Sequence, residues 1–129
     1  MNILDENIIV SQRRQLQSMG IHFKHIGTDI GQRGMKDRNE IIPLLHTLHR
    51  PTFFTHDSDF YDPTLRHKKY ALVCLQVKYS EAGDYIRRVL RHPALRTEAQ
   101  RMGKVIWVQP GGLSYWQVGK EIEQVIMWP

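Results

Sequence analysis

The order of apolar and amphipathic segments predicts an α/β fold, with a central, mostly parallel sheet of about four to five strands flanked by helices in three layers. Strand-like and helix-like segments alternate along most of the chain. The run 70–77 is apolar apart from Gln76, and continuous hydrophobicity indicates a strand that is buried on both faces, as in a parallel sheet. The chain has 129 residues, so we expect 1–129 to form a single domain.

The first half of the chain predicts three strands and two helices. Gly20 follows an amphipathic segment at the place where a glycine commonly ends a helix. Pro43 interrupts the second helical segment, which favours a helix start close to Asn39. The expected elements are a strand at 2–4, a helix at 8–19, a strand at 21–26, a helix at 38–49 and a strand at 52–55.

The second half predicts two further strands and three helices. The last helix is expected because Val118, Ile122, Val125 and Ile126 fall on one stripe at helical spacing. The expected elements are a strand at 70–77, helices at 81–91 and 94–102, a strand at 105–108 and a helix at 114–127.

Composition excludes several classes of protein. Hydrophobic residues make up 41% and charged residues 24%, which is ordinary globular usage and excludes a disordered chain, a collagen and a long coiled coil. The single cysteine, Cys74, excludes an internal disulfide and a cysteine-rich zinc site, and its mid-strand position predicts an inert core thiol. Lysine and arginine exceed aspartate and glutamate by 18 to 13, a net charge of +5, which favours polyanionic partners such as nucleic acid.

No segment predicts a membrane span or a secretory signal. The longest stretch without a charged residue, Val105 to Gly119, has fifteen residues and contains Pro110-Gly111-Gly112, too short and too broken to cross ~30 Å of hydrocarbon as a helix. The first seven residues carry two carboxylates and no basic group. The expected location is the cytoplasm.

Acidic residues follow two of the predicted strands. The carboxyl ends of parallel strands form the functional edge of such a sheet, and crowded carboxylates there repel one another and raise one another's pKa. A hard divalent cation, Mg²⁺ or Mn²⁺, is the natural compensation. Taken singly, each carboxylate also fits a helix or turn cap. The residues concerned are Asp5 and Glu6 after the first strand, Asp57 and Asp59 after the third, and Asp37 and Glu40 at the start of the helix between them.

Three short segments carry a resemblance to a known family. They are Ile3-Leu4-Asp5-Glu6-Asn7, Gly34-Met35-Lys36-Asp37-Arg38-Asn39-Glu40-Ile41, and Phe54-Thr55-His56-Asp57-Ser58-Asp59-Phe60. Together they resemble the PIN-domain nucleases, in particular the small PIN-like branch with a Leu-x-Asp-Glu-Asn box and a Thr-x-Asp-x-Asp-Phe box. The resemblance covers about the first eighty residues, and the remainder fits by the order of its elements.

The resemblance implies a PIN-like sandwich and a metal-dependent nuclease, in most characterised members a ribonuclease and in many the toxin of a toxin–antitoxin pair. Asp5 matches the first-strand aspartate, and Asp57 and Asp59 match the Asp-x-Asp box. Either Glu40 or Asp37 matches the middle acidic position, and Glu6 matches the Asp-Glu-Asn box. The implied catalytic set is Asp5, Asp57, Asp59 and Glu40, and the implied ligands of Mg²⁺ or Mn²⁺ add Asp37 and Glu6. The family also implies an antitoxin partner and a homodimer.

The expected reaction is metal-assisted hydrolysis of a phosphodiester bond, which leaves a 5′-phosphate and a 3′-hydroxyl in this family. Basic residues near the acidic boxes are candidates to hold the substrate strand, and as phosphate contacts they would make binding fall with salt. Taken singly, each also fits a solvated surface charge. The candidates for nucleic-acid binding are Arg13, Arg33, Lys36, Arg38 and His56.

Paired histidines and the three tryptophans are further candidates for chemistry. His46 and His49 stand three apart on a predicted helix and can share a face, but nothing nearby completes a zinc site. Trp107 is expected in the core, whereas Trp116 and Trp128 are expected at the ends of the last helix, for packing, a partner or base stacking.

Three other functions remain open from the sequence. A phospho-receiver domain has a similar acidic pair and a third aspartate, but the last strand is followed by Gln109-Pro110, without the required lysine. A PIN-fold binding module with weak catalysis retains the same acidic residues. A DNA nuclease is not separated from a ribonuclease by the residues themselves.

Overall fold

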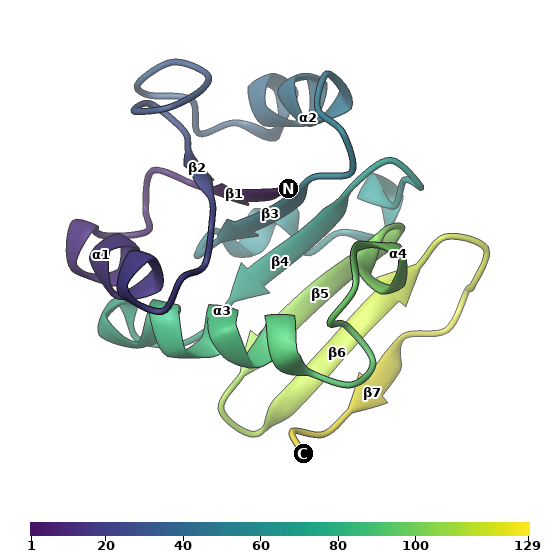
Figure 1. Cartoon of the computed structure of the whole chain (residues 1–129). Coiled ribbons are helices and arrows are strands. Elements are labelled where there is room, and N and C mark those ends of the chain that lie inside the picture. The colour runs from purple at the N-terminus through teal and green to yellow at the C-terminus, as the bar shows by residue number, and fades with distance from the viewer.

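The computed structural model describes residues 1–129 and contains one seven-stranded sheet in the order β2-β1-β3-β4-β5-β6-β7 (Figure 1). The predicted α/β class is confirmed, with seven strands in place of the four or five expected. The strands are β1 (Asn2–Leu4), β2 (Lys24–His25), β3 (Thr52–Thr55), β4 (Ala71–Leu75), β5 (Lys104–Gln109), β6 (Gly112–Gln117) and β7 (Gln124–Ile126). The helices are α1 (Val10–Ser18), α2 (Arg38–His46), α3 (Ala82–Arg91) and α4 (Glu98–Arg101), with 3₁₀ helices η1 (Ser58–Phe60), η2 (Pro63–Leu65) and η3 (Tyr79–Glu81).

The first five strands are parallel and form the buried part of the sheet. β1 pairs with β2 on one side and β3 on the other, and β4 lies between β3 and β5. Every residue of β3 and of β4 is buried, and for β4 the uninterrupted apolar run predicts a strand covered on both faces.

Two separate hydrophobic clusters cover the two faces of the sheet, so the molecule has three layers. Phe54 faces the layer of α1 and α3, where it joins Leu16 and Ile86. The next residue along the strand, Phe53, faces α2, where it joins Leu45. This alternation follows from the two-residue period of a strand, and Figure 1 shows α2 on the opposite side of the sheet from α1 and α3.

The predicted C-terminal helix at 114–127 is wrong, because this segment forms β6 and β7, which extend the sheet antiparallel to β5. The chain reverses at Pro110-Gly111, and all six residues of β6 pair with β5. Aromatic residues such as Tyr115 and Trp116 favour strands, and Gly119 has a positive φ of 82°. The stripe that suggested a helix is exposed: Ile122 is 73% and Val125 72% accessible.

Other predicted bounds shift by a few residues. The end of α1 agrees with the sequence, since Gly20 has φ 75° and the amides of Gly20 and Ile21 donate to the carbonyls of Gln17 and Leu16. The strand expected at 21–26 shortens to β2, and the helix expected at 94–102 shortens to α4, which begins after a Thr97–Gln100 capping box.

None of the helices combines the length and the apolar character that a membrane-spanning helix requires.

Candidate functional site at the carboxyl edge of the sheet

The candidate site lies where the parallel strands end. Asp5 directly follows β1, and His56 and Asp57 directly follow β3. These strands are neighbours in register, with Leu4 opposite Phe54, so their carboxyl ends bring the two aspartates to one edge. Tyr79 reaches the same place from η3, after β4.

Asp5 is a buried carboxylate, with 4% of its surface exposed. Its Oδ1 accepts a hydrogen bond from the amide of Glu6 at 2.7 Å, and its Oδ2 accepts one from the hydroxyl of Thr55 at 2.6 Å. Burial raises the pKa of Asp5, the two hydrogen bonds oppose the rise, and the nearby charges of Asp57 and Glu6 add to it. The fold therefore holds this carboxylate at an electrostatic cost.

The hydroxyl of Thr55 connects the residues of the site. It donates to Asp5, and it accepts hydrogen bonds from the amide of Asp57 at 3.0 Å and from Nδ2 of Asn7 at 3.2 Å. Oδ1 of Asn7 in turn accepts from the amide of His56 at 3.2 Å. One buried side chain thus fixes the spacing of the chain segments that follow β1 and β3.

Glu6 joins this edge to the glycine-containing loop before α2. Its Oε1 accepts a hydrogen bond from the amide of Gly34 at 2.5 Å. A side chain at Gly27 would come within 3.2 Å of the Glu6 carboxyl carbon, so the loop and this carboxylate approach each other closely. The loop continues through Lys36 to Asp37, whose side chain caps α2 by accepting from the amide of Asn39 at 2.8 Å.

Two adjoining clefts open at this edge. The first, here called the acidic cleft, has a volume of about 460 Å³ and is lined by Asp5, Glu6, Asn7, Lys36, His56, Asp57 and Tyr79. The second, here called the outer cleft, has a volume of about 650 Å³, and its charged lining residues are Lys36, Asp37, Arg38, Asp57, Asp59 and Asp62. Lys36 and Asp57 line both, so the two clefts adjoin at these residues.

The carboxylates of the acidic cleft are not neutralised by ion pairs within the protein. The three ion pairs join the N-terminus to Glu98, Arg38 to Asp62, and Arg66 to Glu121. None includes Asp5, Glu6 or Asp57. The only cationic side chain that lines the acidic cleft is Lys36, so the cleft has an excess of negative charge.

His56 is held as a neutral ring beside these carboxylates. Its Nδ1 lies 3.0 Å from the carbonyl of Leu75, and because a carbonyl only accepts, Nδ1 carries the proton. Its Nε2 is buried without a hydrogen-bond partner, and burial lowers the pKa of His56. Tyr79 stacks on the ring at 4.1 Å and is itself 52% exposed.

The structure places some predicted site residues together and others apart. Asp5, Glu6 and Asp57 share the acidic cleft, while Asp37, Asp57 and Asp59 share the outer cleft. Glu40 lies exposed on the first turn of α2, and its side chain makes no hydrogen bond or ion pair and lines neither cleft. Of the two alternatives for the middle carboxylate, Asp37 is the one on a cleft, although its side chain already serves as the cap of α2.

Some of the residues predicted to contact nucleic acid line the clefts, and others do not. Lys36 lines both clefts and His56 lines the acidic cleft. Arg38 lines the outer cleft but pairs with Asp62 at 2.7 Å. Arg33 is exposed on the loop, and Arg13 is turned inward, with its Nε donating to the carbonyl of Ile8 at 3.1 Å.

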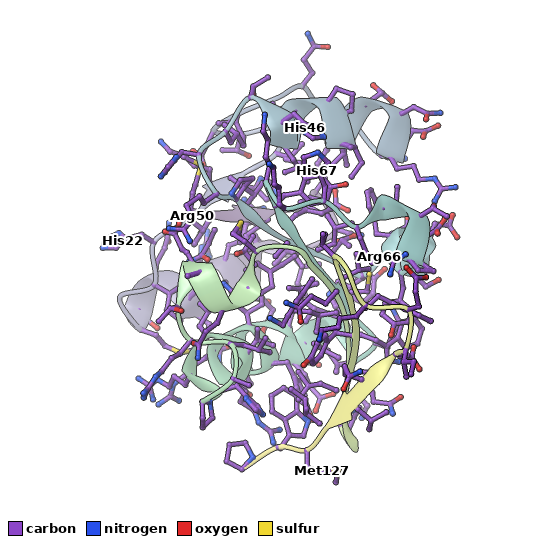
Figure 2. All side chains as sticks on the ribbon, turned by 90° about the vertical axis from the view of Figure 1, so that its right-hand side faces the viewer. His22, His46, Arg50, Arg66, His67 and Met127 are labelled. Atoms are coloured by element: carbon purple, nitrogen blue, oxygen red, sulfur yellow. The ribbon has the colours of Figure 1, made fainter.

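His46 contacts His67 rather than His49. The His46 and His67 rings lie edge to face with their centres 4.5 Å apart, beside Tyr70 (Figure 2). Trp107 is only half-buried on β5, and Trp116 lies on β6, with the Arg66 guanidinium 5.9 Å from its ring. Cys74 is fully buried, as expected of a core thiol, and burial raises its pKa.

The carboxylates of the acidic cleft have the oxygen atoms that a hard cation prefers, but they do not form a complete set of metal ligands. Asp5 and Asp57 offer carboxylate oxygens with no competing cation, and Glu6 adds a third carboxylate on the same cleft. No group of three or more His, Cys, Asp or Glu side chains is arranged to hold a metal ion. Mg²⁺ commonly binds one or two carboxylates and completes its shell with water and phosphate oxygens, so Asp5 and Asp57 are the residues that could hold such an ion here.

Sequence reasoning missed Thr55, Asn7 and Tyr79 as working parts of the site. Thr55 and Asn7 lie inside the segments that resemble the family, and a small polar residue that follows Phe53 and Phe54 at the end of the strand is the signal that points to Thr55. Tyr79 carries no such signal, because its approach to His56 depends on how η3 packs after β4.

Comparisons with protein-family models, with curated proteins and with solved structures each found no match.

Proposed function

We propose that this chain is a PIN-like, Mg²⁺- or Mn²⁺-dependent nuclease that hydrolyses phosphodiester bonds of RNA. The observation that carries the proposal is Asp5, a carboxylate 4% exposed, without a cationic partner, which shares a cleft with Asp57 at the carboxyl ends of parallel strands. A fold keeps a buried charge of this kind when the charge has a use, because perturbed ionisable groups gather at functional sites.

Each side chain of the acidic cleft has its own role in the proposed reaction. Asp5 and Asp57 would hold the cation, with Glu6 beside them. When bound, a divalent cation supplies charge neutralisation at phosphate and a water of lowered pKa. Thr55 and Asn7 fix the carboxylates in place through hydrogen bonds, and Lys36, where the two clefts join, would bind a phosphate of the strand. Asp59, on the outer cleft, would orient water.

The test is cleavage of labelled RNA and labelled single-stranded DNA with EDTA, Mg²⁺ or Mn²⁺. We expect RNA to be cut only with a metal ion, and Asp57→Asn to reduce the rate by roughly 10²-fold or more, as removal of an electrostatic element of an active site does. Glu121→Gln is the matched control, because Glu121 is 86% exposed and lines neither cleft.

Cleavage that persists in EDTA, or that Asp57→Asn leaves unchanged, would refute the proposal. If the protein cuts DNA but not RNA, its substrate is DNA. Comparing Asp37→Asn with Glu40→Gln distinguishes the two middle carboxylates, and the placement of Asp37 on the outer cleft predicts the larger loss for Asp37→Asn.

A second candidate is a PIN-fold module that binds nucleic acid or protein with little catalysis. The absence of a three-residue metal group favours it. Calorimetric binding of Mn²⁺ without cleavage of any nucleic acid would support this candidate. The toxin role, an antitoxin partner and a homodimer belong to the proposal only through the family resemblance.

A further inference from the structure

A pocket of about 510 Å³ lies between α3 and the last residues of the chain, away from the acidic cleft. Its lining includes Arg87, Arg88, Arg91 and Tyr85 of α3 and, from the end of the chain, Trp128. Arginines three and four positions apart share one face of a helix. We refer to this feature as the arginine–tryptophan pocket.

Trp128 is held firmly in this pocket. Its indole Nε1 donates to the carbonyl of Gln109 at 3.0 Å. The preceding carbonyl, of Met127, accepts from Nε2 of the buried His92 at 2.8 Å. The aromatic ring therefore has a fixed position before any ligand arrives, which lowers the entropic cost of binding.

Arg88 is positioned by two aromatic rings. The guanidinium carbon of Arg88 lies 4.3 Å from the centre of the Trp128 ring and 4.9 Å from that of Tyr85. None of the three arginines takes part in an ion pair. Asp84 and Glu81 also line the pocket, but each already accepts a hydrogen bond, from Nε2 of Gln15 at 2.8 Å and from the amide of Lys78 at 3.3 Å. Planar cations beside aromatic rings are the chemistry that binds phosphates and bases of single strands.

An intermediate cleft lies next to both this pocket and the acidic cleft. This intermediate cleft has a volume of about 490 Å³ and shares His56 and Tyr79 with the acidic cleft. The same intermediate cleft shares Glu81 with the arginine–tryptophan pocket and carries Lys78. Tyr79, half-exposed and stacked on His56, stands at the junction of the first two and offers an aromatic face along the path.

We infer that the arginine–tryptophan pocket binds a nucleotide of the single-stranded nucleic acid that crosses the acidic cleft, and so positions the strand at a distance from the bond that is cut. The identity of the strand rests on the proposed nuclease function. The arginines hold its phosphates, and Trp128, which Tyr85 supports from the core, holds a base.

The test is the affinity of a labelled single-stranded oligonucleotide, measured by fluorescence anisotropy in EDTA so that no hydrolysis occurs. We expect Arg88→Ala and Trp128→Ala each to weaken binding about tenfold, the size of one lost stacking contact. Arg91→Glu leaves the packing of Trp128 untouched and should weaken binding at least as much. Arg91→Ala should make the fall of log affinity with log salt less steep, by roughly 0.7 in the slope.

Arg96→Glu is the control for charge, because the side chain of Arg96 is exposed, forms no ion pair and lines none of these clefts. Equal losses for Arg91→Glu and Arg96→Glu would overturn the inference in favour of unspecific attraction. No loss for Arg88→Ala and Arg91→Glu would also overturn it, and would leave the pocket to an acidic protein segment. Binding that depends on the pocket in a protein that cuts nothing would refute only the nuclease function.

Discussion

Thr55 determines the electrostatics of the candidate site although it carries no charge. Its hydroxyl gives Asp5 the side-chain hydrogen bond that opposes the rise of the pKa of Asp5 through burial. Because the folded protein holds this proton more tightly than the unfolded chain, the contribution of protonated Asp5 to stability is complete below its ordinary pKa of 3.8. That contribution is lost as the pH rises through the higher folded value.

We expect Thr55→Val to destabilise the protein more at pH 7 than at about pH 3.5. At pH 7 the variant leaves a buried carboxylate without one of its donors, at a cost of about 1–3 kcal/mol. At the lower pH Asp5 is protonated, so the variant loses less stability. Urea unfolding at both pH values, with the Asp5 carboxyl followed by NMR, measures the effect, and the pKa of Asp5 should rise further above 3.8 in the variant.

Thr52→Val serves as the control on the same strand. Thr52 is also fully buried, and its hydroxyl accepts from Nε of Arg101 at 2.9 Å. Arg101 stays charged over this range, so the cost of Thr52→Val should not change with pH. A pH-independent cost for Thr55→Val would contradict the electrostatic role assigned to Thr55.

At the scale of elements, the sequence identifies the parallel strands better than it identifies the C-terminal third. The strand at 52–55 has the predicted bounds, because an apolar run between Pro51 and a polar turn leaves little choice. The segment 114–127 carries a stripe that fits a helix, but pairing with β5 decides its structure. Propensity is local, whereas strand pairing depends on a distant partner.

The sequence predicts which acidic residues share a sheet edge to the same extent and for the same reason. The acidic residues that directly follow β1 and β3 meet because the strands do. Glu40 was placed by its position in a motif, and its exposure follows from the rotation of α2, which turns Ile41 and Leu45 toward the core. The face that a helix presents is set by packing, which a short motif does not contain.

The end of α1 tests one local prediction directly. Gly20 has φ 75° and open space around the position of a side chain, so Gly20→Ala meets backbone strain but no clash. We expect a loss of about 1 kcal/mol in the free energy of unfolding. Gly111→Ala is the matched control, because Gly111 has equal space and no positive φ, and it should change stability by less than about 0.5 kcal/mol. Equal effects in urea unfolding would contradict the role of φ.

At the scale of the whole molecule, Cys74 reports on global opening. It is fully buried in the middle of the sheet and burial raises the pKa of its thiol. We expect an aromatic disulfide reagent to label it only through unfolding. Mg²⁺ at one hundred times its Kd should slow labelling about a hundredfold by stabilising the folded state.

Asp57→Asn gives the control for that experiment, because it removes one of the two carboxylates assigned to the cation. Labelling of this variant should be insensitive to Mg²⁺. Rapid labelling of the native protein without denaturant would show that the sheet opens locally around β4, contrary to the complete burial of that strand.

The antiparallel strands β6 and β7 determine which end of the chain can carry a fusion partner. By turning back through β6 and β7, the chain brings Pro129 into the lining of the arginine–tryptophan pocket. Met1 lies at the other end of the strands, where its carbonyl accepts from the amide of Thr52 and its exposed ammonium pairs with Glu98. An exposed pair of this kind contributes at most about 1 kcal/mol. A fusion or an affinity handle therefore belongs before Met1, whereas any segment that continues from Pro129 leaves through the entrance that a bound strand would occupy.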